Sequence, residues 1–426
     1  MSVLKFWVWL SSLAGLKPKT RYELLNAFGD PEALYFADEK QILGRLAISE
    51  PERTSLMDKS LDKANEILEK CRENGTAVIT LQDAVYPQRL KNIYDPPVVL
   101  YVKGRLPAID EQAAIGVVGT RKATSYGIKM AQKLGFEITK CGGLVVTGLA
   151  EGIDSAAAEG ALRAGGSCIG VLGCAIDDVY PKTNSGLYDD VAMAGALVSE
   201  YPPGAALTRK NFPERNRIIS GLSIGVAVVE APFGSGALIT SSLALEQGRE
   251  VFAVPGNADA PNWFGSNELI RNGAQLVTKG WDVLEGFERL FPGKLSKSGA
   301  GRIQSFQYRQ ENEKTVPTTE KSEKKTLLPV ETGQGFAKLK VRTDRKRIDN
   351  AEKREYIDLQ EQLSGLTENQ LKIISVMEKK SMHVDDIIDL SGLAAPAVLS
   401  ELTILQIKGF VTQESGKRFT LNIKKP

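Results

Sequence analysis

The stretch AIGVVGTRKATSYGIKMAQKLGFEITKCGGLVVTGLAEGID, residues 114–154, decides the fold of this chain. It contains two short apolar runs, Ile115–Val118 and Leu144–Thr147, and each run is followed at once by a glycine. Between the two runs, Tyr126–Thr139 carries apolar residues at helical spacing. The pattern predicts a strand, a helix and a second strand, with a tight turn after each strand.

The same alternation continues as far as Phe291. Nearly continuous apolar strands that alternate with helices are typical of a parallel sheet covered on both faces. Because the connections in such a sheet are right-handed, we predict a doubly wound, mostly parallel α/β sheet with its binding crevice at the carboxyl ends of the strands. The further predicted strands are Cys168–Leu172, Ala196–Ser199, Ile224–Val229, Val251–Val254 and Gln275–Val277.

Residues 1–110 are predicted to form an N-terminal helical domain, and residues 111–292 the domain with the sheet. Near the start, Leu13–Pro18 lies between two helical patterns and resembles the turn of a helix-hairpin-helix or SAM-like domain. The second glycine usual in that turn is replaced by Lys17, so a helical packing domain without phosphate contact is the alternative.

Residues 293–360 are rich in charged and small residues and are predicted to be a flexible linker. Its basic second half leaves an auxiliary DNA contact as an alternative to a solvated tether. Residues 361–426 show three helical patterns and a hairpin, the order of a winged helix, with a capping box at Thr367 and Gln370. The third helix, Ala397–Ile407, has no cation, which favours a protein contact over the reading of duplex DNA.

Composition argues against several classes of catalyst and compartment. The chain has 426 residues, a net charge of +2 and a single histidine, His383, which we interpret as a solvated or capping residue at a helix start. No other histidine is present for a Ser-His-Asp or Cys-His site, and we expect no metal and no cofactor. The four cysteines show no CxxC spacing, which fits a reducing compartment.

The apolar run Phe6–Leu10 has the composition of a signal-peptide core, but no A-x-A cleavage pattern follows it. No run in the chain approaches the length needed to cross a bilayer. We therefore expect a cytoplasmic protein that does not contact a membrane.

Candidate binding residues follow the predicted strands, where a doubly wound fold places its site. Glycine turns at helix starts offer backbone N–H groups to anions, and arginine adds a bidentate fork suited to phosphate. So many phosphate-seeking groups exceed what one mononucleotide needs and suit a polyanionic strand. The predicted nucleic-acid-binding residues are Gly119, Thr120, Arg121, Gly148, Lys182, Asn184, Arg215, Asn216, Arg217, Ser235, Gly236 and Thr240.

Enzymatic alternatives lack their motifs. The first helix is not opened by a complete G-x-G-x-x-G, and no G-x-x-x-x-G-K-[ST] occurs, so a dinucleotide site and a P-loop are disfavoured. The alternative kept open is a phosphoribohydrolase-like enzyme acting on nucleoside monophosphates, which would use a PGGxGTxxE turn. The corresponding stretch from Gly234 has no glutamate until Glu246, so the expected acid/base is missing.

Motifs in a fixed order resemble the DNA-processing protein A family (DprA, also called Smf). The resemblance covers roughly Val117–Leu290, and its motifs include GTR at 119–121, GLAEGID at 148–154, VYPKTN at 179–184, SEYPPG at 199–204, FPERNRIISGLS at 212–223, SGALIT at 235–240 and GSNELIRNGA at 265–274. It implies an extended Rossmann-like domain that binds single-stranded DNA, with Arg121, Lys182, Arg215 and Arg217 in its basic pocket.

The resemblance further implies a non-catalytic protein that forms a homodimer and loads the RecA recombinase onto incoming DNA during natural transformation (competence) and recombination. A contact with single-strand binding protein is left open. Two positions depart from the family: Ala157 stands where a histidine is frequent, and Pro232–Gly234 lacks the usual arginine or lysine. The departures predict a pocket with one cation fewer.

Overall fold

The computed structural model describes residues 3–297, 366–377, 381–408, 410–414 and 418–422. The chain divides into two compact units, Met1–Gln304 and Ser305–Pro426. Each unit has its own hydrophobic core and is described by itself. The predicted linker, residues 293–360, lies almost entirely outside the described residues.

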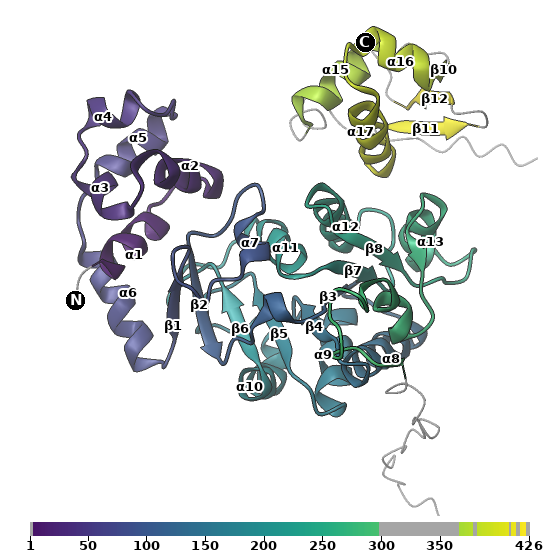
Figure 1. The fold of residues 1–426 in the computed structure, drawn as a ribbon, viewed down its shortest axis with the longest axis horizontal. Coiled ribbons are helices and arrows are strands. Elements are labelled where there is room, and N and C mark those ends of the chain that lie inside the picture. Colours follow the sequence, from purple (N-terminus) through teal and green to yellow (C-terminus); the bar gives the residue numbers. More distant parts are fainter. Residues whose placement is uncertain (1–2, 298–365, 378–380, 409, 415–417, 423–426) are drawn as a thin grey trace, which may run out of the picture. The chain divides into compact units, whose positions relative to one another are not determined.

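A nine-stranded sheet forms the centre of the first unit, in the order β1-β2-β6-β5-β4-β3-β7-β8-β9 (Figure 1). Within the block from β6 to β9, every strand is parallel to its neighbours. This confirms the predicted doubly wound, mostly parallel sheet. These strands are β3 (Ala114–Val118), β4 (Leu144–Thr147), β5 (Cys168–Leu172), β6 (Ala196–Ser199), β7 (Gly225–Val228), β8 (Glu250–Ala253) and β9 (Gln275–Leu276).

Two strands before residue 110 extend this sheet and correct the helical prediction for that region. β1 (Ala77–Thr80) pairs antiparallel with β2 (Val99–Gly104), and β2 pairs antiparallel with β6. The physical reason lies in Val98–Val102, a fully buried run of β-branched, aliphatic and aromatic residues that suits a central strand. The predicted boundary at residue 110 therefore falls after two strands that already belong to the sheet.

Helices precede β1, as predicted. In the first of them, Phe6–Leu10 is fully buried, so the run with signal-peptide composition packs into the core of the first unit. The helices are α1 (Leu4–Ser12), α2 (Pro18–Phe28), α3 (Pro31–Phe36), α4 (Glu39–Leu43), α5 (Glu50–Met57) and α6 (Asp62–Glu73), with α7 (Gln88–Lys91) between β1 and β2.

A buried carboxylate, Glu52, joins α2 to α5. It accepts hydrogen bonds from Thr20 Oγ1 at 2.7 Å and from Ser49 Oγ at 2.7 Å. Burial alone would raise the pKa of Glu52, but the hydrogen bonds from Ser49 and Thr20 outweigh burial and lower the pKa to about 2.

Acid should therefore weaken this part of the fold. Because the folded pKa lies below the ordinary value of 4.5, the stabilisation is present above pH 4.5 and is lost as the pH falls toward about 2. Glu52→Gln should lower the free energy of unfolding at pH 7 by on the order of 3 kcal/mol, a gap that closes in acid. Urea titrations across this pH range measure it. Glu69→Gln, which removes an exposed ion pair with Arg72, should change little; a pH-independent gap for Glu52→Gln would contradict the assignment.

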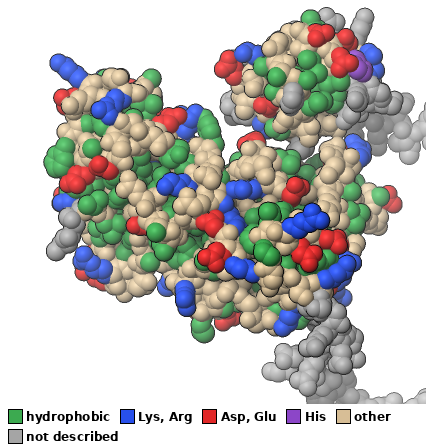
Figure 2. Space-filling view, viewed as in Figure 1, with side chains coloured by type: hydrophobic (Ala, Val, Ile, Leu, Met, Phe, Trp, Pro, Cys, Tyr) green, Lys and Arg blue, Asp and Glu red, His purple; other side chains and the backbone are tan. Residues whose placement is uncertain are grey.

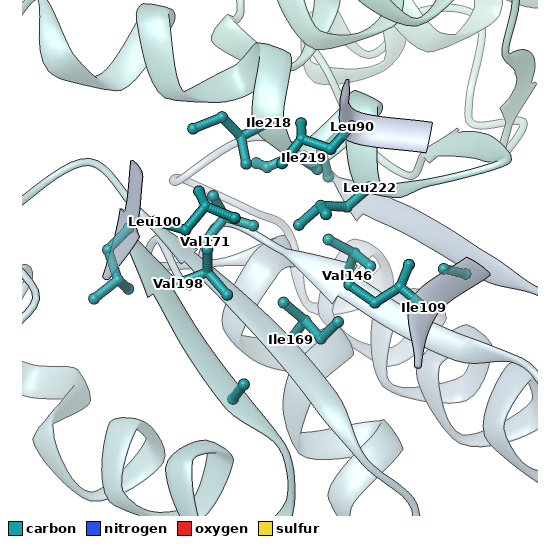
Figure 3. Close-up of a cluster of buried hydrophobic side chains, with 14 of the residues drawn as sticks. Leu90, Leu100, Ile109, Val146, Ile169, Val171, Val198, Ile218, Ile219 and Leu222 are labelled. Atoms are coloured by element: carbon teal, nitrogen blue, oxygen red, sulfur yellow. The ribbon is translucent and has the colours of Figure 1, made fainter. Parts of the chain in front are cut away.

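Helices cover both faces of the sheet (Figure 1). One face carries α8 (Ser125–Lys140), α9 (Ile153–Arg163) and α10 (Ser185–Ala194), and the other carries α7, α11 (Asn211–Leu222) and α12 (Gly236–Glu246). α13 (Phe264–Arg271) packs beside β8. In Figure 3, side chains of α11 and α7 lie over those of the central strands. The short 3-10 helices are Ile109–Glu111, Lys182–Asn184, Pro261–Trp263, Gly280–Val283 and Glu285–Phe287.

The second unit is a winged helix, as predicted. It contains α15 (Glu368–Val376), α16 (Val384–Ser391), α17 (Ala395–Ile407) and a sheet in the order β10 (Met382–His383), β12 (Arg418–Leu421), β11 (Val411–Glu414). The predicted capping box is present, with Gln370 N donating to Thr367 Oγ1 at 3.2 Å. His383 caps α16 through its Nδ1, as interpreted from the sequence. The predicted hairpin is present as β11 and β12, and residues 415–417 between these strands lie outside the described residues.

None of the described helices combines the length and apolar character that a bilayer-spanning segment needs. Lys and Arg side chains are interspersed with Asp and Glu on the face of the first unit drawn in Figure 2. A binding site for an anion must therefore be built locally.

Candidate nucleic-acid interface

Two adjoining cavities lie at the carboxyl edge of the parallel strands. The first, of about 490 Å³, is lined by the loops after β3 and β7 and by the starts of α11 and α12. The second, of about 320 Å³, is lined by the loops after β4, β5 and β6. Residues common to both linings are Arg121, Ala150, Phe212 and Arg215.

Three exposed cations line the cavities: Arg121 and Lys122 in the first, and Arg121 and Lys182 in the second. The Arg121 guanidinium lies over the Phe212 ring, 5.0 Å from its centroid, so the pair forms the partition between the two cavities. When an arginine lies over an aromatic ring, the N–H groups in the plane of its guanidinium group remain free to bind an anion.

Arg215 has a different role from Arg121 although it lines both cavities. Only 4% of its surface is exposed, and its Nη1 donates to the carbonyl oxygens of Gly148, at 2.9 Å, and Val171. Burial lowers the pKa of Arg215, and the carboxylate of Asp154 opposes this. Its hydrogen bonds fix the ends of β4 and β5, so Arg215 builds the cavity wall.

Asp154 holds the two glycine turns together from inside. Its Oδ1 accepts from Gly119 N at 3.3 Å and its Oδ2 from Gly148 N at 3.1 Å. Burial raises the pKa of Asp154 to about 6, against Arg215 and these backbone N–H groups, which lower it. A Cβ at Gly148 would lie 2.5 Å from Arg215 Nη2 and 2.7 Å from Asp154 Oδ2, so only glycine fits.

This arrangement revises one expectation. Asp154 lies in the first turn of α9, whose N-cap is Gly152. The N–H groups of Gly119 and Gly148, predicted to hold an external anion, already donate to the Asp154 carboxylate. The anion at these turns is therefore a side chain of the protein.

A second buried carboxylate, Glu230, shapes the loop that carries Arg121. Thr124 donates to it through its Oγ1 at 2.8 Å, and Asn262 Nδ2 donates at 2.9 Å. Thr120 N donates to the Glu230 carbonyl oxygen at 2.7 Å. Glu230 thus accepts hydrogen bonds from residues on both sides of Arg121 and Lys122, and these bonds restrain the backbone that carries the two cations.

The start of α12 supplies further donors to the first cavity. Ser235 is its N-cap and accepts from Ala237 N at 3.3 Å, and Gly236 follows at the first helical position. The positive end of this helix dipole faces the cavity lined by Arg121, which favours an anion there.

The structure brings most of the predicted residues together. Asn184 lies outside both linings and donates to the Leu149 carbonyl oxygen at 3.0 Å and to Ser155 Oγ at 2.8 Å, so it supports the loop from behind. In the first cavity the predicted residues are Gly119, Thr120, Arg121, Arg215, Asn216, Ser235, Gly236 and Thr240. In the second they include Gly148 and Lys182.

Arg217 is not brought to the cavities. It is 4% exposed, with its Nε 3.0 Å from Asp95 Oδ2 and its Nη2 2.8 Å from Glu200 Oε2. Burial would lower the pKa of Arg217, but Glu200 and Asp95 together raise it. The ion pairs of Arg217 therefore connect α11 to the loop before β2 and to the loop after β6.

The lining residues that are absent from the set predicted from the sequence include one lysine and two phenylalanines. Lys122 directly follows the GTR turn, Phe212 opens the FPERNR motif, and Phe233 precedes the glycine turn of α12. Phe233 is 64% exposed. Aromatic residues beside cations are a signal of single-strand binding that phosphate-seeking groups alone do not provide.

Within the described residues, no group of three or more His, Cys, Asp or Glu side chains is arranged to hold a metal ion. The four cysteines are buried and are not joined in disulfides.

Comparisons with known proteins agree with this architecture. The family described as "DNA recombination-mediator protein A" matches residues 77–288, and the "DprA winged helix domain" matches residues 359–417. DNA processing protein DprA of Bacillus subtilis is 43% identical over 52% of this chain and 75% of its own length. Protein Smf of Synechocystis is 34% identical over 83% of this chain and 82% of its own length. The X-ray structure of DNA processing protein A from Streptococcus pneumoniae matches with a TM-score of 0.60 and 33% identity, covering 67% of this chain and 98% of that one.

Proposed function

Because this chain belongs to the DNA-processing protein A (DprA/Smf) family, we propose that its two adjoining cavities bind single-stranded DNA. One observation carries the proposal: three exposed cations, Arg121, Lys122 and Lys182, lie beside the aromatic rings of Phe212 and Phe233 at one edge of the sheet. Cations that track a backbone beside rings on which bases stack are the general arrangement of single-strand binding.

The geometry favours a single strand over a duplex. The cavities are concave and are divided by the Arg121–Phe212 stack. A duplex keeps its bases stacked inside and offers no base to such a partition, whereas a single strand can turn its bases toward the rings. The interactions on offer are to phosphates and to ring faces, so binding should depend weakly on base sequence and strongly on salt.

A protein that binds a single strand can present this strand to a second protein, and this is the cellular role that we propose. We propose that the chain helps load RecA onto strands covered by single-strand binding protein, in natural transformation and recombination. A homodimer would join two strand-binding sites and raise the effective concentration of each for the same strand. The winged helix, with α17 free of cations, fits a protein contact better than duplex reading.

The chain is proposed to act without catalysis. The one carboxylate in the lining of the first cavity is Asp154, which is held by the Gly119 and Gly148 N–H groups. Glu246, the nearest candidate for a phosphoribohydrolase acid/base in the sequence, ends α12 about 15 Å along the helix from Gly236. The first cavity, where the glycine turn of α12 lies, therefore offers no carboxylate other than Asp154 for the enzymatic alternative.

A RecA strand-exchange assay on strands coated with single-strand binding protein tests the proposal. The wild-type chain should shorten the lag, and Arg121→Ala should remove this effect because the partition of the two cavities is lost. Lys40→Ala, which removes an exposed cation on α4, is the matched control and should behave as wild type. Acceleration that survives in Arg121→Ala would contradict a loader that works by holding the strand in these cavities.

A further inference from the structure

We propose that the path of the single strand continues beyond the two cavities onto the N-terminal helices, across a site formed by Lys19 of α2 and Tyr94. We call these two residues the outer platform. The inference rests on the proposed single-strand binding and extends it to a surface some distance along the sheet edge.

The topology places the outer platform at the same edge of the sheet as the cavities. β2 runs antiparallel to β6, so the loop that precedes β2 opens where the parallel strands end. Tyr94 lies in that loop, and its neighbour Asp95 binds Arg217 of α11, Oδ2 to Nε, at 3.0 Å. Phe212, on the cavity wall, lies five residues before Arg217, or about 7.5 Å along the helix axis. The loop with Tyr94 therefore lies beside the cavity wall.

The outer platform has the chemistry of a nucleotide contact. Tyr94 is 70% exposed, although no core packing requires an aromatic residue there. Lys19 Nζ lies 4.3 Å from the centroid of its ring and also contacts its hydroxyl group. An exposed ring can stack with a base of any identity, and the ammonium beside it can meet the following phosphate. Glu23, whose carboxylate is 3.6 Å from Lys19 Nζ, partly offsets this charge.

The charges near the start of α11 are of both signs. Asp95 and Glu200 are both paired with Arg217, and Glu214 is exposed and accepts a hydrogen bond from Tyr201. Arg209 and Lys210 are exposed directly before α11, in the segment between Leu207 and Phe212, which both line the second cavity. A strand that leaves the second cavity along this segment thus meets two cations.

The distance fits an oligonucleotide of ordinary length. From β3, at the first cavity, to β2 there are four strand spacings in the sheet order, or about 19 Å at roughly 4.8 Å each. A stacked single strand rises about 3.4 Å per nucleotide, so about six nucleotides span this distance. Strands of about four nucleotides should therefore fill the cavities alone, and longer strands should reach the outer platform.

Fluorescence anisotropy with labelled dT strands of about 4 and about 20 nucleotides tests this on the full chain. The double variant Lys19→Gln, Tyr94→Ala should bind the long strand about tenfold more weakly and the short strand like wild type. Tyr94→Phe, which keeps the ring, should retain most of the long-strand affinity. Lys40→Gln, which removes one exposed charge elsewhere on the N-terminal helices, is the control and should leave both affinities unchanged.

The outcomes separate this inference from the function on which it rests. If the double variant binds both strands like wild type, or weakens both equally, the outer platform is not a separate binding surface and the inference fails. Arg121→Ala should weaken both lengths; if it weakens neither, the proposed function fails first. A melting temperature equal to that of wild type verifies that the double variant is folded.

Discussion

Replacement of Arg217 by alanine is expected to destabilise the folded chain by about 3–5 kcal/mol, because it leaves two carboxylates without their shared partner. Arg217 is 4% exposed, and the side chain of Glu200 is 9% exposed. Burial already raises the pKa of Asp95, against the attraction of Arg217, which lowers it. Without the guanidinium, Asp95 and Glu200 would repel each other in a site that little water reaches.

Urea unfolding of the purified variant measures this loss. The matched control is Arg271→Ala, which removes an ion pair to Glu268 from a side chain that is 70% exposed and should cost less than about 1 kcal/mol. A variant of Arg217 that keeps wild-type stability but loses single-strand binding would show that this arginine contacts DNA after all. The family resemblance alone predicted that second result, and the structure predicts the first.

Removal of the three exposed cations, Arg121→Gln with Lys122→Gln and Lys182→Gln, is expected to lower single-strand affinity on the order of a hundredfold at low salt. These side chains line the cavities and are exposed, so their replacement should leave the fold intact. Removing one cation–phosphate interaction should reduce the slope of log affinity against log salt by about 0.7, and removing all three should reduce it by about 2.

Anisotropy titrations over a salt series, with poly-dT and poly-dA in parallel, measure both quantities. The decrease in affinity should be similar for the two strands, since none of the three cations reads base edges. The control is a triple variant of exposed lysines away from the cavities, Lys40→Gln with Lys63→Gln and Lys129→Gln, which changes the net charge equally. An equal decrease in the control would mean that overall charge and not the cavities sets the affinity.

The strands of the parallel sheet could be predicted because each is a short apolar run bounded by turn residues. β1 and β2 could not be predicted in the same way, because they lie among helices and because β2 follows Pro96 and Pro97, which are typical of a loop. The run Val98–Val102 does carry the β-branched and aromatic character of a strand. The local sequence does not indicate which strand β2 pairs with, because its partner β6 lies almost a hundred residues later in the chain.

The site was predictable as a set of loops but not as a set of side-chain roles. Arg215 and Arg217 stand two residues apart in one motif, and on a helix this separation turns them about 200° from each other. One can therefore face the cavities only if the other faces away. Asp154 accepts from Gly148 within its own motif, but it accepts from Gly119 only because two segments that are 35 residues apart meet, which no spacing in the sequence indicates.

The position of β2 beside β6 affects the tendency of the sheet to aggregate through its edge. An outer parallel strand presents a row of unpaired backbone groups to which another chain can add a strand. β2 covers that side of β6, and β1, only four residues long, is left as the edge. Evolutionary loss of the N-terminal segment would uncover β6, so the segment also protects the sheet against edge-to-edge aggregation.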